Sequence, residues 1–105
     1  MAGGRRVWIP KKVGETVTIP FDFISDLSTT ETLTTASVAA SVYSGVDASP
    51  SSIVSGLATI SGTKVLQTIT GGTEGVIYGL LCTVDTDDSQ TLNMSTYCAV
   101  EPDLP

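Results

Sequence analysis

Three aspartates, Asp85, Asp87 and Asp88, stand close together near the C-terminal end of the chain. Carboxylates grouped in this way could hold a hard cation such as calcium. Their spacing does not match an EF-hand loop, and Asp is also favoured in turns because its short side chain bonds the nearby backbone. We therefore predict a polar turn with no metal ligands, and the cation-binding alternative stays open.

A glycine-rich stretch over residues 71–75 is the second candidate, because loops of this kind can cradle a phosphate. It lacks the Gly-Lys-Ser/Thr ending of a phosphate loop, leads into no predicted helix, and carries Glu74, which would repel phosphate. We interpret it as a corner between two strands. The hydroxyl of Tyr78 is predicted to anchor that corner, as the tyrosine corner does in immunoglobulin-like domains.

Catalytic groups are scarce. The chain has no histidine, which removes the commonest general base and metal ligand. Neither Cys82 nor Cys98 has an obvious activating partner, and no Gly-x-Ser-x-Gly elbow occurs. We predict no enzyme activity, no catalytic residue and no cofactor.

The elements that position these residues read as strands. Residues 76–86 and 91–100 alternate apolar and polar side chains around a turn at residues 87–89, which is typical of an antiparallel hairpin. That register sets Cys82 opposite Met94 and Cys98 opposite Tyr78. The cysteines are then about 13 Å apart along the ladder, beyond the roughly 7 Å between Cα atoms that a disulfide allows. We predict two buried free thiols, which fits a reducing compartment.

Further strands are predicted upstream of the hairpin. Residues 13–24 alternate cleanly, with Pro20 marking an edge or a break, and residues 33–43 favour a strand with a short helix as the alternative. Residues 53–60 and 63–70 add two more. Six to eight short strands with regularly spaced turns predict an all-β, immunoglobulin-like antiparallel sandwich.

The charge is unevenly distributed along the 105 residues, whose net charge is −6. Four of the five basic residues lie within the first twelve, around the single tryptophan, and the eleven acidic residues all follow them. An acidic body repels nucleic acid and anionic membranes, so we expect neither as a partner. We expect no secretory signal and no membrane helix, because no apolar run approaches twenty residues.

This contrast predicts three segments: an extended basic N-terminal arm (1–12), a sandwich (13–101) and a C-terminal tail (102–105). The first twelve residues could form an edge strand whose Trp8 packs in the domain's own core. We favour an arm that inserts into a neighbouring subunit, because Trp and Arg are preferred interface anchors. The predicted interface residues are Arg5, Arg6, Trp8, Lys11 and Lys12.

A family resemblance rests on Gly56-Leu57, Val65, Ile69 and the run Gly-Gly-Thr-x-Gly-x-x-Tyr that ends at Tyr78. Thr83-Val-Asp-Thr and Gln90-Thr follow. Over residues 11–100 the chain resembles the small immunoglobulin-like virion proteins of tailed bacteriophages, which are fibre–tail adaptors or minor neck and tail components.

The resemblance transfers no functional residue. Members often place Arg and acidic residues in the last hairpin, where this chain has Thr91, Asn93 and Ser95.

The resemblance implies a virion structural protein, assembled in the host cytoplasm and present in several copies of a symmetric assembly. It would join the head–tail connector or the tail to fibres, with connector, tail or fibre subunits as its partners. Two alternatives stay open. One is a capsid decoration protein on the head surface, and the other is an immunoglobulin-like binding module, for example for carbohydrate.

Overall fold

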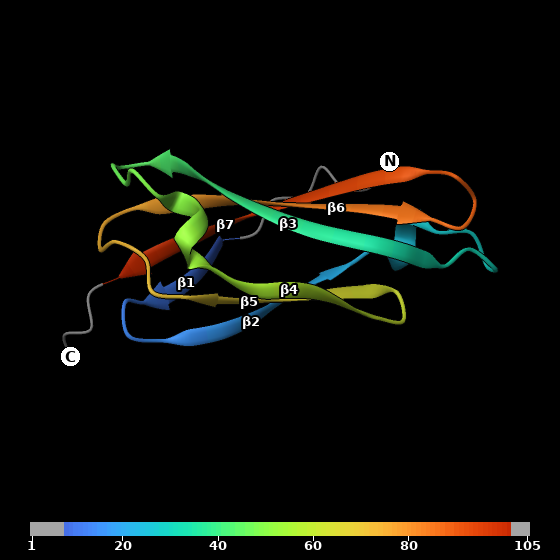
Figure 1. Ribbon diagram of the computed structural model, residues 1–105, viewed down its shortest axis with the longest axis horizontal. Helices are drawn as coiled ribbons and strands as arrows, with labels where there is room; N and C mark the ends of the chain where they lie inside the picture. Colours follow the sequence, from blue (N-terminus) through green and yellow to red (C-terminus); the bar gives the residue numbers. More distant parts are fainter. Residues whose placement is uncertain (1–7, 102–105) are drawn as a thin grey trace.

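The computed structural model describes the backbone of residues 8–101 and the side chains of residues 10–101. Two β-sheets pack face to face (Figure 1), one with strand order β1-β7-β6-β3 and the other with order β2-β5-β4. All strand pairs are antiparallel except β1 with β7, which is parallel. The predicted immunoglobulin-like β-sandwich is confirmed. The strands are β1 (Trp8–Lys12), β2 (Thr16–Asp22), β3 (Leu33–Ser44), β4 (Val54–Ser61), β5 (Lys64–Thr70), β6 (Ile77–Thr86) and β7 (Thr91–Glu101).

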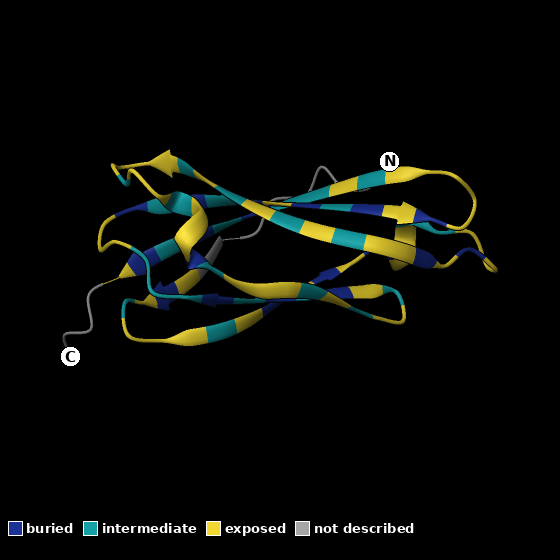
Figure 2. Cartoon of the chain, in the orientation of Figure 1, coloured by how far each residue is buried: buried dark blue, intermediate teal, exposed yellow. Residues whose placement is uncertain are grey.

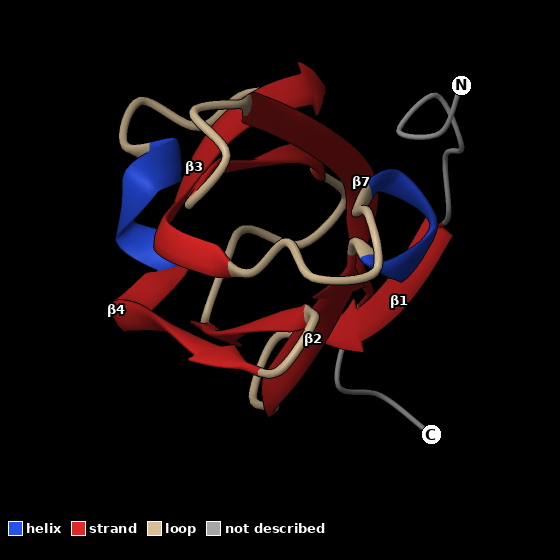
Figure 3. Ribbon diagram, turned by 90° about the vertical axis from the view of Figure 1, so that its right-hand side faces the viewer, coloured by secondary structure: helices blue, strands red, loops and turns tan. Residues whose placement is uncertain are grey.

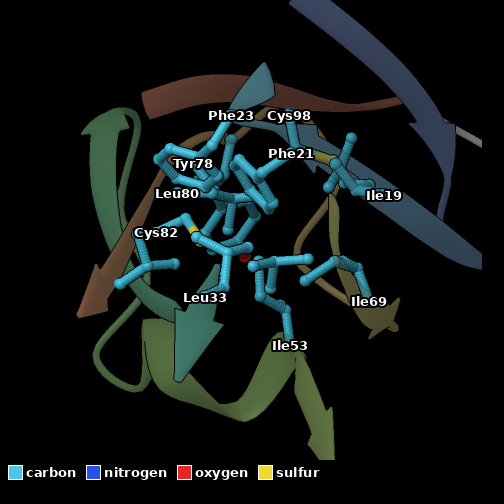
Figure 4. Close-up of a cluster of buried hydrophobic side chains, with 14 residues drawn as sticks. Ile19, Phe21, Phe23, Leu33, Ile53, Ile69, Tyr78, Leu80, Cys82 and Cys98 are labelled. Carbon is cyan, nitrogen blue, oxygen red and sulfur yellow. The ribbon is translucent and has the colours of Figure 1, made fainter. Parts of the chain in front are cut away.

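The core forms where the inward faces of the two sheets meet (Figure 4). The alternation in the sequence becomes alternating burial along the strands, most regularly in β5 and β6 (Figure 2). Phe21 and Phe23 come from the three-stranded side, while Tyr78 and Leu80 come from β6, and all four are essentially inaccessible. Burial of such aromatic and aliphatic side chains is the main force that holds the sheets together.

The β6–β7 hairpin has the predicted register. Tyr78 pairs with Cys98, and Cys82 pairs with Met94. Both cysteines are free and buried. Burial raises the pKa of the Cys82 thiol to about 12. Burial also raises the pKa of Cys98, although the positive charge of Lys11 lowers it in part. Both sulfurs therefore behave as small core hydrophobes.

Residues 33–44 form a strand, and not the short helix held open as an alternative. Its alanines are compatible with helix, but the inward series Ala36, Val38, Ala40 and Val42 has the period of a sheet and packs against the core. The connection before it holds one 3₁₀ turn, η1 (Ile24–Asp26).

The register of β4 against β5 slips between Ser55 and Thr59. Gln67 of β5 points inward at this slip, and its Nε2 donates to the carbonyl oxygens of Ser55 at 3.1 Å and Gly56 at 3.3 Å. The amide thus replaces strand-to-strand bonds that the bulge removes. Leu57, in the bulge, is 94% exposed.

The backbone of residues 8–12 forms an edge strand, which was the alternative to a free arm. Trp8 pairs with Tyr97 and Lys12 with Glu101, so β1 is part of the four-stranded sheet. The sheet therefore begins before residue 13, where the predicted sandwich was taken to start. The remainder of the predicted arm and the predicted tail, residues 102–105, lie outside the described residues.

Candidate functional site

The five predicted interface residues have different positions. Arg5 and Arg6 lie outside the described residues, and Trp8 is described by its backbone alone, in β1. Lys12 is exposed at the end of β1, whereas Lys11 is 1% exposed. Although Lys11 and Lys12 are neighbours in sequence, the side chain of Lys11 is buried and that of Lys12 is exposed to solvent.

Lys11 is tied into its own domain. Alternation along β1 puts its side chain on the inner face, opposite Val100, and the ammonium reaches the end of the sandwich. Its Nζ donates to the carbonyl oxygens of Lys12 at 2.8 Å, Val13 at 3.2 Å and Gly71 at 2.6 Å. An ammonium has three donors, so all three are used within the chain. Lys11 was expected in a contact surface, and the structure places it inside the fold as a fastener between β1 and the β5–β6 corner.

Tyr78 anchors that same corner, as predicted. Its hydroxyl donates to Asp47 Oδ2 at 2.6 Å and accepts from the Thr73 backbone N–H at 2.8 Å. The hydrogen bonds from Tyr78 and from the Ser49 N–H hold the pKa of the Asp47 carboxyl below its ordinary value. Burial and the bond to Asp47 raise the pKa of Tyr78. Asp47 was missed in the sequence because nothing near it predicts a partner 31 residues away.

A second polar cluster lies at the opposite end of the sandwich, where Glu31 bridges the β2–β3 connection to the β6–β7 turn. Glu31 Oε2 accepts from the Thr86 hydroxyl at 2.5 Å and from Gln90 Nε2 at 3.0 Å, while Oε1 accepts from the Ser28 N–H at 3.1 Å. The bond from the Thr86 hydroxyl, followed by that from the Ser28 N–H, lowers the pKa of Glu31. The side chain is 7% exposed, so it is a structural link.

Two of the three aspartates near the hairpin tip, Asp85 and Asp87, use their carboxylates within the chain. Asp85 accepts from the hydroxyls of Thr35 and Thr91, and Asp87 Oδ1 accepts from the Thr32 N–H at 3.0 Å. Over residues 8–101, no group of three His, Cys, Asp or Glu side chains is arranged to hold a metal ion. The two carboxylates thus link the hairpin to β3 and to Thr32 just before it, whereas the sequence predicted only bonds to the nearby backbone.

Six of the ten acidic residues within residues 8–101 belong to the segments at this end, which is on the right in Figure 1: Asp22, Asp26, Glu31, Asp85, Asp87 and Asp88. Lys64, at the same end, is the one basic residue within residues 13–101. This end of the described chain therefore carries more negative than positive charge. Within residues 8–101 no helix is long and apolar enough to cross a membrane.

One comparison with known proteins identifies a family. Residues 11–99 match the sequence model of a family described as podophage GP4 fiber-tail adaptor protein gp77. The match spans all seven strands apart from the first residues of β1 and the last of β7. No curated protein matches the chain.

Proposed function

Since the chain belongs to the fibre–tail adaptor family of podophages, we propose that it is a virion structural protein that joins the head–tail connector or the tail to the fibres. The family match over residues 11–99 carries this proposal. It covers the folded body, so it concerns the whole sandwich and not a shared corner motif.

The physical character of the sandwich supports a structural role. Side-chain hydrogen bonds between residues distant in sequence close both ends: Lys11 donates to Gly71, Tyr78 donates to Asp47, and Glu31 accepts from Thr86. Such bonds fix the loops against the sheets and give a rigid body on which partners can be held in fixed positions. With no histidine in the chain and both thiols buried, a binding role fits better than catalysis.

The contact to the neighbouring virion protein is proposed to use the basic N-terminal residues. Arg5, Arg6, Trp8 and Lys12 remain the candidates, because the ammonium of Lys11 is occupied by three carbonyl groups. Removal of residues 1–12 would delete β1 and the Lys11 fastener together with the arm. Removal of residues 2–7 leaves both in place and is the sharper test.

The position of the protein on the particle tests the function. Antibody or gold labelling of intact virions, read by electron microscopy, should mark the single vertex that carries the neck and tail. Label spread over the head surface would contradict this and make the chain a decoration protein. Labelling of no particle, together with hits on a glycan array, would instead favour the carbohydrate-binding alternative.

The role of the N-terminal residues is tested by charge reversal. The double variant Arg5→Glu with Arg6→Glu should be incorporated into particles at least tenfold less than the wild type, because reversed charge repels a surface that attracted the arm. Lys64→Glu, an exposed basic residue in β5, is the matched control and should be incorporated normally. Full incorporation of the double variant would exclude these arginines from the contact.

A further inference from the structure

The sandwich has four sheet edges within residues 8–101, and three of them carry features that discourage strand addition. The edge strand β1 has five residues and contains Pro10. The edge strand β2 contains Pro20 and the charged Asp22, and β4 is interrupted by the bulge between Ser55 and Thr59. Proline, charge and bulges are the usual means by which proteins protect their edges.

The fourth edge, β3, is the least protected, because its two irregularities lie at its ends, between Leu33 and Thr35 and between Val42 and Ser44, and leave the middle of the strand regularly paired. It is twelve residues long, LTTASVAASVYS, with no proline, no glycine and no charged residue. Its inward side chains Ala36, Val38, Ala40 and Val42 are only half-buried, while those of the neighbouring β6 are fully buried (Figure 2). The core is thus incompletely covered along this edge.

The helical turn η2 (Pro50–Ile53) lies between β3 and β4 (Figure 3), near the C-terminal end of β3 in Figure 1. The side of the sandwich that contains β3, η2 and β4 is nearly uncharged. From residue 33 to residue 63 the sequence has one charged residue, Asp47, and its carboxylate is bonded to Tyr78.

The charge pattern decides which partner this edge fits. Two copies of a chain with net charge −6 repel one another wherever their acidic surfaces meet. The neutral side is where two copies can approach without bringing like charges together. We propose that β3 is the contact through which two copies of this chain associate.

The pairing is edge to edge. When the same strand edge meets itself about a two-fold axis, the two strands run antiparallel. The two four-stranded sheets then become one continuous eight-stranded sheet. The added strand supplies main-chain hydrogen bonds and covers the half-buried apolar side chains of β3.

A lysine on this edge tests the proposal in the purified full chain. Ala39 is exposed on β3, and Ala39→Lys should weaken self-association by at least tenfold in sedimentation equilibrium, since a charge on the edge opposes pairing. Thr18→Lys, exposed on the β2 edge, is the matched control and should leave the association constant unchanged. Added salt should strengthen association of the wild type, because it screens the repulsion between acidic bodies.

Cysteine substitutions test the geometry directly. Single cysteines at the exposed β3 positions Ser37, Ala39 and Ser41 should include one that forms an intermolecular disulfide under mild oxidation, whereas Thr18→Cys should not. A wild-type chain that stays monomeric at all concentrations and salt levels would overturn the proposal. If that monomeric chain also needed Ala39 for its incorporation into particles, so that Ala39→Lys were excluded from them, the β3 edge would instead receive a strand from another protein. These measurements on the isolated chain do not depend on the proposed virion role, so either can fail alone.

Discussion

Lys11 is a charged side chain held inside a small sandwich by carbonyl oxygens instead of a carboxylate. Each N–H of the ammonium finds an acceptor, so the cost of removing the charge from water is offset by three charge-assisted hydrogen bonds. The bond to Gly71 spans 60 residues of sequence and joins the first strand to the β5–β6 corner. A residue that looks like surface in the sequence is therefore part of the scaffold.

We expect Lys11→Met to lower the free energy of unfolding by about 2 kcal/mol, since it leaves three partly buried carbonyl groups without the donor that the ammonium supplies. Lys12→Met, next to it and exposed, should change stability by about 0.5 kcal/mol at most. Urea denaturation measures both. Equal stability of the two variants would show that water replaces the ammonium without loss.

Acid should destabilise the protein through Asp47 and Glu31. The pKa of each is lowered in the folded state, so the folded protein binds protons less readily than the unfolded chain. Their contribution is complete above the ordinary carboxyl pKa and is lost as the pH falls below about 4, through the lower folded values. Tyr78→Phe removes the largest cause of the Asp47 shift and should flatten the fall of the melting temperature between pH 5 and pH 3. An identical acid profile in the variant would contradict this assignment.

At the scale of the elements, the β5–β6 corner depends on a glycine that faces the core. Gly72 has φ +99°, and a Cβ built there would lie 2.9 Å from Val100 Cγ2. Gly62, in the β4–β5 turn, also has a positive φ of +63°, but no atom lies within 4 Å of its Cβ position. A side chain at Gly62 would therefore meet backbone strain alone, whereas one at Gly72 would meet backbone strain and a steric clash.

Gly72→Ala should cost about 3 kcal/mol of stability, because backbone strain and the clash with Val100 add together. Gly62→Ala should cost about 1 kcal/mol, from the backbone conformation alone. Thermal denaturation of the two variants measures the difference. Equal losses would mean that the corner relaxes around the new methyl group.

Local alternation predicted the elements well. Period-2 patterns located the strands that contain Phe21 and Tyr78, and the turn at residues 87–89 fixed the pairing of Cys82 with Met94. The tyrosine anchor was also predictable, since its glycine-rich corner lies within seven residues of it. These features depend on neighbours in sequence, which is where residue types carry information.

Long-range features were not predictable. The parallel pairing of Trp8 with Tyr97, the bond from Lys11 to Gly71 and that from Tyr78 to Asp47 each join distant segments. The residues next to Trp8, Lys11 and Asp47 in the sequence do not indicate which distant segment each of them contacts. The half-buried edge of β3 also depends on how the two sheets align, which the sequence of β3 does not reveal.

At the scale of the molecule, the two thiols report on opening of the whole sandwich. Cys82 and Cys98 lie on adjacent central strands and are fully buried, with raised pKa values. At pH 8 we expect the folded protein to react with a thiol reagent at least a thousandfold more slowly than the unfolded chain, since both exposure and the thiolate form are suppressed. Fast reaction of one cysteine in the native protein would reveal local opening of its strand.

The parallel pairing of β1 with β7 also has a mechanical consequence. The chain enters β1 at Trp8 and leaves β7 at Glu101, so tension between the two termini slides these strands along each other. Shear of this kind loads all the hydrogen bonds between β1 and β7 at once, where peeling would break them singly. The bond from Lys11 to Gly71 adds a further fastening to β1. Pulling single molecules by their termini should give a lower rupture force for Lys11→Met than for the wild type, and equal forces would exclude that fastening. If the two termini were pulled apart by the proteins attached to them, the β1–β7 pairing would carry the load, and β1 would be the first strand to detach.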